Sequence, residues 1–463
     1  MSARRRREVL DSQRMQTLLE NPLLLVLILA TPVLVLVTPF RTGWLLALVV
    51  FAWADSSMPY ADFARRPWVR FAALLLVAFH GAVRLRGRGR GVSPPATAIV
   101  LFAYCLVSLL WADPFDYPAG STVFLGLLWA VLFGLVARLA PTSAQATSAA
   151  DRIAYVVGAL LVIGLLPFGR AESIVVEGTG RLRGFFNNPN GLGVTCAIIA
   201  PFVAVAATRA RGAQRIWRFG ALAALAGLAF FSGSRTGAGG LVAGVSVALF
   251  VRHPSRYLLG VAAIGMLAAL ATLARGDLDL EEGATGNLIR GQTISRLSGR
   301  LDRWKAGLDM WGESPVLGKG FMTSRKIQFV GLSDDATTVS AGADTSGQGV
   351  NFHSQWIESL VDLGLVGTTL LLSLGFGLVR RARRLARVVG DPGMAAFGAA
   401  YLGTLTAVAL DAFFHNWILT PGSPFALLFW GLSALALRLD HLSRQSRPAP
   451  RPAAVAALEF AHR

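Results

Sequence analysis

Long apolar segments follow one another along most of the chain, separated by short polar stretches. A bilayer core of about 30 Å is crossed by roughly 20 helical residues, or slightly fewer with local thinning, and twelve segments are long enough. They lie at 22–40, 42–58, 96–111, 121–139, 152–168, 190–208, 216–231, 236–251, 256–274, 356–379, 394–414 and 417–437. The pattern predicts an all-α polytopic membrane protein with about 12 transmembrane helices.

One polar stretch, 275–355, interrupts this pattern. The chain therefore divides into a basic N-terminus (1–21), about nine spans (22–274), the polar loop (275–355), three further spans (356–437) and a basic tail (438–463). Functional residues concentrate in loops held by a rigid scaffold, so we expect the chemistry to lie at this loop.

The arginine distribution predicts the orientation, because short loops rich in Lys and Arg stay in the cytoplasm. With twelve spans, the arginine-rich stretches all fall on one side; they are 4–14, 65–90, 209–218, 252–256, 380–387 and 438 onward. Both termini are then cytoplasmic, and the loop 275–355 is extracytoplasmic on the cytoplasmic (inner) membrane. This assignment requires the additional apolar stretch 68–83 to be interfacial or re-entrant. If it spans the membrane, either the arginine-rich segments before it or those after it would lie outside.

Composition excludes a soluble domain, since 54% of the residues are hydrophobic and 15% are charged. The net charge of +18 comes from short arginine runs between apolar segments, so anionic lipids are a better partner than nucleic acid. Cys105 and Cys196 lie inside apolar segments, without the spacing of a disulfide framework or metal site. The basic start lacks a clear cleavage site, which favours an uncleaved first span over a signal peptide.

Three arginines are expected on the outer side, against the general charge bias. Arg181 and Arg183 precede the span 190–208, and Arg235 lies in the turn Ser232-Gly-Ser-Arg235-Thr. Such residues either reach lipid phosphate or hold an anion at the membrane surface. The first explanation is favoured for Arg181. The small residues around Arg235 let a ligand approach closely and favour the second, and Arg183 falls between the two.

The polar loop contains two recognisable local patterns. Residues 298–311 form an amphipathic helical pattern with an apolar stripe of Leu301, Trp304, Leu308 and Trp311, most simply explained by packing on the spans. A tight turn follows at Pro315-Val-Leu-Gly318-Lys-Gly320, which is weak evidence for phosphate binding on its own. The stretch 331–350, rich in Ser, Thr, Gly and Asp, is typical of a mobile flap.

His353 stands immediately before the span 356–379, with Glu358 and Asp362 inside that span. Carboxylates within a membrane are costly unless they orient a partner or bind something. Among side chains, imidazole has the ordinary pKa best suited to proton transfer near neutrality. A lone histidine is more often structural than catalytic, but this position favours a functional one.

Five motifs in order resemble the O-antigen ligase and polymerase superfamily. They are Arg183-Gly-Phe-Phe-Asn-Asn-Pro-Asn190, Ser-Gly-Ser-Arg235-Thr-Gly, Ser-Gly-Arg300-x-x-x-Trp304, Pro315-x-x-Gly-x-Gly320 and His353-Ser-x-x-x-Glu-x-x-x-x-x-Gly-x-x-Gly367. The resemblance covers about residues 183–367, and Ser354 departs from it by replacing an asparagine that often follows the family's histidine.

The resemblance implies an inverting, metal-independent glycosyltransferase without a cofactor. It would move a glycan from a polyprenyl diphosphate carrier to a glycan or lipid acceptor on the outer face. By similarity, Arg235 and Arg300 would hold the diphosphate, with Arg183 a weaker candidate, and His353 would activate the acceptor hydroxyl. Glu358, Trp304 and Asn190 would support the site, Asn190 as a helix-start residue.

Several alternatives stay open from the sequence. Within the superfamily, a ligase, a repeat-unit polymerase and a protein glycosyltransferase are not separated, nor is the oligomeric state. A transporter of a glycolipid or small anion would use ionisable residues near mid-span, for which Glu358 and Asp411 are the candidates. A structural partner in an envelope-synthesis complex would not need the outer arginines. A metal site at Asp277-Leu-Asp279 is less favoured than an acidic, solvated loop.

Overall fold

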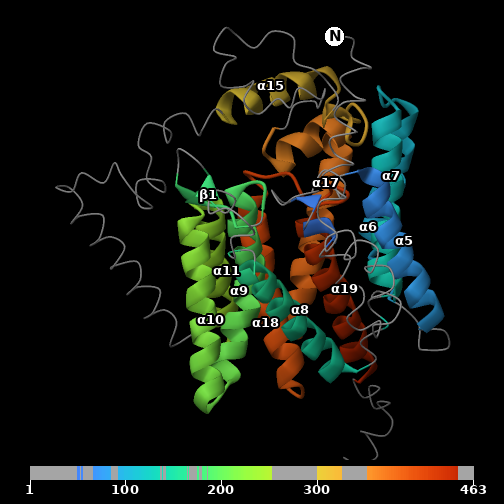
Figure 1. The fold of residues 1–463 in the computed structure, drawn as a ribbon. Coiled ribbons are helices and arrows are strands. Elements are labelled where there is room, and N and C mark those ends of the chain that lie inside the picture. The colour runs from blue at the N-terminus through green and yellow to red at the C-terminus, as the bar shows by residue number, and fades with distance from the viewer. Residues whose placement is uncertain are drawn as a thin grey trace, which may run out of the picture.

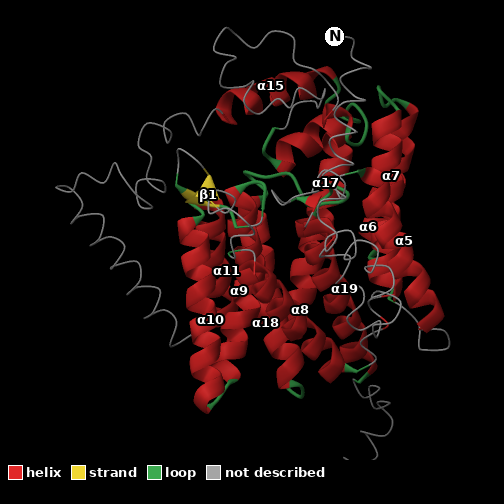
Figure 2. Ribbon diagram, viewed as in Figure 1, coloured by secondary structure: helices red, strands yellow, loops and turns green. Residues whose placement is uncertain are grey.

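The computed structural model describes residues 50–52, 54–55, 66–84, 92–135, 138, 142–163, 165, 175–176, 180–184, 186–252, 300–325 and 352–446. These residues are mostly helical, as predicted, with one antiparallel pair of two-residue strands, β1 (Val175–Val176) and β2 (Arg181–Leu182) (Figures 1 and 2). The predicted spans 22–40 and 256–274, most of 42–58, the acidic cluster near 277–282 and the predicted flap 331–350 lie outside the described residues.

Each predicted span within the described part of the chain corresponds to a helix. The first group is α5 (Pro67–Arg84), α6 (Ala96–Val107) with the turn η1 (Ser108–Leu110), α7 (Asp116–Trp129) continuing as the π-helical η2 (Ala130–Leu135), and α8 (Ser143–Ile163). The second group is α9 (Pro189–Arg209), α10 (Gly212–Phe231), α11 (Arg235–Arg252), α17 (Gln355–Ala386), α18 (Pro392–Asp411) and α19 (Pro424–Gln445). The predicted bounds miss most at α8, which begins at 143 rather than 152, and at α19, which begins at 424 rather than 417.

Five of the described helices are long and apolar enough to cross a membrane: α7 with η2, α9, α17, α18 and α19. They establish the polytopic membrane class, but they do not confirm the predicted count of about 12 spans. The apolar parts of α5 and of α6 with η1 are shorter. Figure 1 shows α5 running alongside α6 and α7; whether it spans or is interfacial stays a prediction.

Small residues let α9, α11 and α18 pack at the centre of the bundle. A Cβ added to Gly237 of α11 would lie 2.6 Å from the backbone of Gly193 in α9, and one added to Gly403 of α18 would lie 2.3 Å from the carbonyl oxygen of Gly244 in α11. The Thr404 hydroxyl of α18 donates a hydrogen bond to the Ile198 carbonyl of α9 at 2.8 Å. Close backbone approach and such hydrogen bonds hold membrane helices together where the hydrophobic effect does not.

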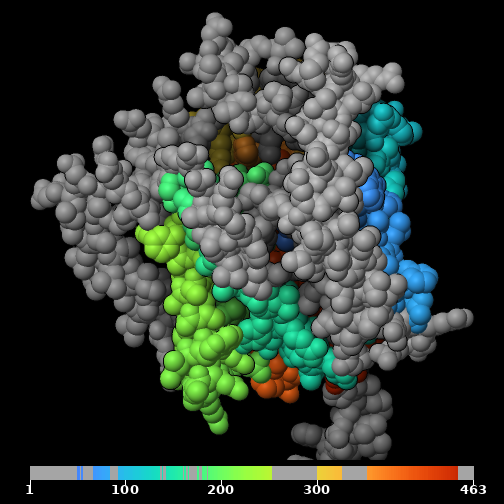
Figure 3. Space-filling model, in the orientation of Figure 1, coloured from blue at the N-terminus to red at the C-terminus, as the bar shows by residue number. Residues whose placement is uncertain are grey.

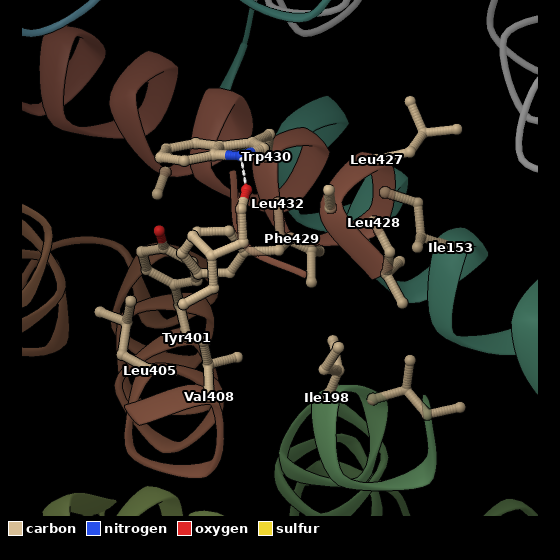
Figure 4. Close-up of a cluster of buried hydrophobic side chains, with 14 of the residues drawn as sticks. Ile153, Ile198, Tyr401, Leu405, Val408, Leu427, Leu428, Phe429, Trp430 and Leu432 are labelled. Atoms are coloured by element: carbon tan, nitrogen blue, oxygen red, sulfur yellow. Dashed lines mark hydrogen bonds between the residues drawn. The ribbon is translucent and has the colours of Figure 1, made fainter. Parts of the chain in front are cut away.

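Large aromatic side chains fill the other side of the core, around α19 (Figure 4). The ring of Trp430 is 5.0 Å from that of Trp129 in a T-shaped contact, and its indole nitrogen donates to the Ile418 carbonyl at 2.8 Å. The Tyr401 hydroxyl bonds that of Ser433 at 2.7 Å. The buried polar atoms of Trp430 and Tyr401 thus have partners, as buried Trp and Tyr usually do, whereas the indole nitrogen of Trp129 makes no hydrogen bond to a described residue.

Helix α17 is broken at Gly364, whose φ of 62° and ψ of −164° are not helical. The turn 315–320 pairs with this break. Lys319 N donates to Val361 O at 2.8 Å and Gly320 N to Asp362 O at 2.8 Å, while Leu365 N donates to Pro315 O at 2.9 Å. Non-helical backbone at membrane depth is tolerated only where protein or water satisfies it. The Gly-x-Gly turn therefore completes the backbone hydrogen bonding of α17.

Among the described residues, a helix lies across only one end of the bundle. Helix α15 (Arg300–Glu313) lies across one end, where α9, α11, α17 and α19 begin and α18 ends (Figure 1). At the opposite end the Asp440 carboxylate accepts hydrogen bonds from Arg384 at 3.1 and 2.9 Å and from Arg444 at 3.0 Å.

Helices α8 and α10 lie on the outer surface of the bundle in Figure 3.

Candidate functional site at the covered end of the bundle

A cavity of about 280 Å³ lies at the end of the bundle that α15 covers. Its wall is built from segments far apart in sequence: residues 54–55, the start of α9, the turn η7 (Thr323–Arg325), the segment 352–354 and the loop between α18 and α19. Five side chains in this wall are charged or carry an imidazole, namely Asp55, Arg70, Arg325, His353 and His415.

His353 lies in this wall on a left-handed backbone with a φ of 50°. The pKa of His353 is lowered to about 3, first by burial and then by the positive charges of Arg303 and Arg300, with smaller contributions from His415 and Arg325. The imidazole is therefore neutral near pH 7. A neutral imidazole offers one hydrogen-bond donor and one acceptor.

Arg325 is held in the wall by partners from helix α17 and from the loop between α18 and α19. Its Nε donates to Glu358 Oε1 of α17 at 2.8 Å, and its Nη2 donates to the Asn416 carbonyl and to the Thr420 hydroxyl, both at 2.9 Å. Burial lowers the pKa of Arg325, but Glu358, with smaller contributions from Tyr117 and Asp362, raises it, and the net shift is upward. Nη1 makes no hydrogen bond to any described residue, so this corner of the guanidinium remains available to a ligand.

The two carboxylates predicted to need partners in α17 both hold the segment that carries Arg325. Glu358 also accepts a hydrogen bond from Asn416 Nδ2. Asp362 accepts from the backbone N–H groups of Met322 at 3.1 Å and Ser324 at 2.9 Å. Met322 has a φ of 62°, so Asp362 stabilises a strained turn immediately before Arg325. Within the described residues, both carboxylates orient protein groups.

His415 follows the end of α18 and forms a hydrogen-bonded row with Asp411 and Trp417. Its Nδ1 is 2.6 Å from Asp411 Oδ1, and the indole nitrogen of Trp417 donates to Asp411 Oδ2 at 2.6 Å. The Gln355 N–H donates to the carbonyls of Ala412 and His415, which ties this loop to the start of α17. The row is thereby placed beside His353.

Arg300 and Trp304 extend the site along α15. The guanidinium carbon of Arg300 is 5.4 Å from the ring centroid of Phe414, and Trp304 donates from its indole nitrogen to the Phe352 carbonyl at 3.1 Å. The pKa of Arg300 is lowered by burial, raised by Asp411 and lowered by Arg303 and Arg235. Arg235, the first residue of α11, is therefore close enough to interact electrostatically with Arg300.

Arg181 binds protein groups, which differs from the contact with lipid phosphate that its sequence context predicted. Its Nε donates to the Ser232 carbonyl at 2.9 Å and its Nη2 to Asn190 Oδ1 at 2.9 Å, while its side chain packs on Gly233. Asn190 is the second residue of α9, as predicted, and its N–H donates to Asn188 Oδ1 at 2.9 Å. Arg181 thus fixes the turn that leads into Arg235.

The structure brings most of the predicted site residues to one end of the bundle. His353 and Asn190 line the cavity, Glu358 binds a lining residue, Trp304 holds the residue before His353, and Arg300 influences the pKa of His353. The three predicted diphosphate-binding arginines, Arg183, Arg235 and Arg300, are not among the residues that line the cavity. The helix predicted at 298–311 is present as α15, but its apolar stripe does not pack as predicted: Leu301 and Leu308 are 46% and 44% exposed, and Gly307 is the buried residue.

Sequence reasoning missed Arg325 and His415 and assigned Asp411 only to a transporter. The spacing of His415 four residues after Asp411 was a usable signal, since an i,i+4 pair meets on one face of a helix or its continuing turn. Arg325 carried no such signal, because its carboxylate partner lies in a different helix.

Comparison with known proteins gives two relevant matches. Residues 220–372 match a family described as O-Antigen ligase. The exopolysaccharide production protein ExoQ of Rhizobium meliloti (strain 1021) is 31% identical over 279 residues, which cover 57% of this chain and 60% of ExoQ. The match therefore spans less than two thirds of that relative. The predicted resemblance to the O-antigen ligase and polymerase superfamily is confirmed.

One solved structure is also similar, a chain from "Structural coordination of polymerization and crosslinking by a peptidoglycan synthase complex". The identity is 18%, the TM-score is 0.45, and the match covers 76% of this chain and 97% of that one.

Proposed function

This chain resembles the O-antigen ligase and polymerase superfamily, and on that premise we propose that it is a membrane-embedded glycosyltransferase. It moves a glycan from a polyprenyl diphosphate carrier to an acceptor hydroxyl, with inversion at the anomeric carbon. The observation that carries the proposal is the convergence of arginines and imidazoles at one cavity: Arg325, His353 and His415 line it, and Arg300 acts on His353 from α15.

The arginines match the charge that the reaction develops. When the bond between sugar and diphosphate breaks, negative charge grows on the leaving oxygens, and preorganised cations stabilise that transition state. A guanidinium binds two phosphate oxygens at once and stays charged at every relevant pH. We assign this role to Arg235 and Arg300. Arg325 also binds the diphosphate in this proposal, through Nη1. Arg183 is a weaker candidate for the same role.

His353 activates the acceptor hydroxyl in this proposal. It is neutral near pH 7, so one ring nitrogen can accept a hydrogen bond from the hydroxyl. The positive charges that keep it neutral belong to the residues next to it, and a bound diphosphate would offset them. A bound diphosphate therefore makes the ring nitrogen of His353 a stronger hydrogen-bond acceptor for the hydroxyl than it is in the empty site.

The charge of the two bundle ends supports an outward-facing site. Arg209, Arg252 and Arg384 lie at helix ends opposite the cavity, and short arginine-rich loops stay in the cytoplasm. The cavity then opens on the extracytoplasmic side of the cytoplasmic membrane, where the glycan end of a lipid carrier and its acceptor are available. The lipid portion of the donor lies in the surrounding bilayer.

A polymerase of repeat units is the second candidate function. The name of ExoQ refers to exopolysaccharide production, which fits chain elongation as well as ligation of a finished chain. Both reactions use the same donor chemistry and differ in the acceptor. The transporter alternative is less supported, because Glu358 and Asp411 are each bonded to protein groups at the bundle end.

The test is glycan transfer in membranes that carry the wild-type protein, His353→Ala or His353→Asn, with the lipid-linked glycan of the source cells as donor. Asparagine tolerates left-handed backbone better than alanine and controls for strain at this position. Discrete products lost in both variants support a ligase, and a lost ladder supports a polymerase. No transfer by the wild type, or equal transfer by all three, removes the catalytic role of His353.

A further inference from the structure

The row Asp411, His415 and Trp417 has a geometry that packing alone does not require. Asp411 is the last residue of α18, and each of its carboxylate oxygens is 2.6 Å from a ring nitrogen, one from His415 and one from Trp417. A carboxylate only accepts hydrogen bonds, so Nδ1 of His415 carries the hydrogen and Nε2 carries the lone pair.

The lone pair of His415 has no partner in the part of the chain that the structure describes. Nε2 is buried and makes no hydrogen bond, although the residue lines the cavity. Buried polar atoms nearly always have a partner, and an exception calls for a ligand or an ordered water. A purely structural histidine would be expected to satisfy both ring nitrogens. In His415, Nδ1 is held by Asp411, and Nε2 can accept a hydrogen bond from a ligand in the cavity.

The backbone holds this ring rigidly. The N–H groups of Phe414 and His415 donate to the Asp411 carbonyl at 2.8 and 2.9 Å, which forms a tight turn at the end of α18. The side-chain oxygen of Gln355 accepts from the Ile418 N–H at 3.0 Å and fixes the following loop to α17. Catalytic groups act efficiently when supporting contacts lock their orientation in this way.

Two charged groups bind Asn416, the residue after His415. Arg325 contacts the Asn416 carbonyl from η7, and Glu358 of α17 contacts the Asn416 side chain. The ring of His353 adds a neutral neighbour.

Three more charged residues complete this environment. Arg300 of α15 interacts electrostatically with Asp411, while Asp55 and Arg70 line the same cavity as His415. The immediate carboxylate partner of His415 is Asp411, and no other described acidic residue is ion-paired with it.

We propose that His415 is a second catalytic imidazole of the cavity and that Asp411 is its positioning residue. Nε2 of His415 takes the proton that the acceptor hydroxyl loses. The hydroxyl oxygen forms the new bond to the anomeric carbon, the bond from that carbon to the diphosphate oxygen breaks, and its electron pair leaves with the carrier diphosphate. The proton then passes from Nε2 to water. This inference rests on the proposed function.

In this proposal His353 orients the acceptor hydroxyl, and His415 accepts its proton. Burial and Arg303 lower the pKa of His353 to about 3, and a base is most effective when its pKa lies near the working pH. His353 therefore orients the hydroxyl through a hydrogen bond, and the proton ends on the imidazole that has a carboxylate behind it. Two imidazoles in one cavity give the proton a short path from substrate to solvent.

The first experiment measures transfer in membranes with His415→Gln, Asp411→Asn and the matched control His441→Gln, which removes an exposed histidine of α19. Loss of a general base costs about 10² to 10⁴ in rate, so we expect His415→Gln to lower kcat by that factor with the donor KM unchanged. Asp411→Asn should lower kcat. It should also move the fall of kcat on the acidic side of the pH profile to lower pH, which the loss of a purely structural residue would not do.

The outcomes separate this inference from the proposed function. If His353→Asn and Arg300→Gln are inactive while His415→Gln transfers at the wild-type rate, the inference is overturned and the proposed function stands. If the wild type transfers nothing, both fall. If Asp411→Asn loses activity with an unchanged pH profile, Asp411 is structural and the positioning role is overturned.

The second experiment reads the tautomer without any turnover. The chain has six histidines, so labelling histidine with ¹⁵N gives a simple spectrum of the purified full-length protein that His→Gln variants assign. We expect His415 to show a protonated Nδ1 and an unprotonated Nε2 at neutral pH, and Asp411→Asn to shift it toward the other tautomer. A protonated Nε2 in the wild type would overturn the proposal.

Discussion

Gly318 and Gly364 each occupy the space that a side chain on the other would need. A Cβ on Gly318 would lie 2.4 Å from the Gly364 nitrogen, and a Cβ on Gly364 would lie 2.6 Å from the Gly318 nitrogen and 2.3 Å from the Val316 carbonyl oxygen. Both residues have positive φ, 71° and 62°. The turn and the helix break therefore fit together only as glycine against glycine, and this contact sets the position of Arg325 seven residues after Gly318.

Replacing Gly364 with alanine is expected to destabilise the protein by about 2–4 kcal/mol, because left-handed backbone and a steric clash act together. The thermal unfolding midpoint of the purified protein measures the effect. Gly375→Ala in the same helix is the matched control, since an added Cβ there meets nothing within 4 Å. Equal midpoints for the two variants would contradict the packing described here.

Arg235→Gln and Arg300→Gln are each expected to lower glycan transfer by about 10²- to 10³-fold, because each removes a cation that stabilises the leaving diphosphate. The rate at saturating donor is the measurement. Lys305→Gln controls for the loss of one positive charge from α15, since Lys305 is exposed on the same helix as Arg300. Comparable losses in all three variants would point to net charge rather than to the site.

Glu358→Gln is expected to cost about 3–5 kcal/mol of stability, because it leaves the charge of Arg325 partly buried without its carboxylate. The side chains of Arg325 and Glu358 are 20% and 4% exposed. In the surface pair of Lys319 with Glu313, the acid is 66% exposed, so Glu313→Gln should cost about 0–1 kcal/mol. The thermal unfolding midpoints of the two variants test this expectation. A similar small decrease in both midpoints would mean that the pair of Arg325 and Glu358 is exposed to solvent.

His353 is expected to make stability depend on pH. Its pKa is about 3 in the folded protein, against an ordinary value of about 6.5 for the unfolded chain. Between these values only the unfolded chain binds the proton, so the stability that His353 contributes is present above about pH 6.5 and is lost as pH falls toward 3.

The measurement is the unfolding midpoint against pH for the wild type and His353→Asn, which cannot titrate and tolerates the left-handed backbone. The wild type should lose more stability than the variant between about pH 6.5 and 4. Parallel curves would show that His353 has its ordinary pKa.

Glycan transfer is expected to continue in the presence of a chelator. Arg235, Arg300 and Arg303 concentrate positive charge at the site, which serves the diphosphate in place of a divalent cation and repels one. Transfer by the purified protein with and without EDTA is the test. Inactivation that added Mg²⁺ reverses would instead favour the acidic cluster near residue 277.

The fold class followed from the sequence because apolar periodicity is a local property. Segment 190–208 predicted α9 (Pro189–Arg209) to within a residue, since Asn188 and Pro189 mark its start clearly. The predicted start of the span 417–437 was wrong, because Trp417, Ile418 and Leu419 are apolar and buried but lie in a loop before α19. Hydropathy reports burial and does not distinguish a buried loop from a helix.

The site was only partly predictable for a similar reason. Motif spacing identified His353, Arg235 and Arg300, whose residue types and order carry the resemblance. It did not show that Glu358 would bind Arg325, because that pairing depends on how the turn at 315–320 docks on α17. Nor did it indicate that Asp411, at the end of an apolar segment, would turn back to His415.

Helix α9 has the highest hydropathy of the five candidate spans, and 94% of its most apolar window is buried inside the protein. Lipid therefore contributes little to its surroundings, and the neighbouring helices α8, α10, α11 and α18 supply most of its contacts. Exchanging the bilayer for detergent during extraction should leave this helix, and the Asn190 end that reaches the cavity, in the same environment. The cavity is thus held by a helix that protein surrounds on nearly all sides, and the detergent-solubilised protein is suitable for testing the proposed activity.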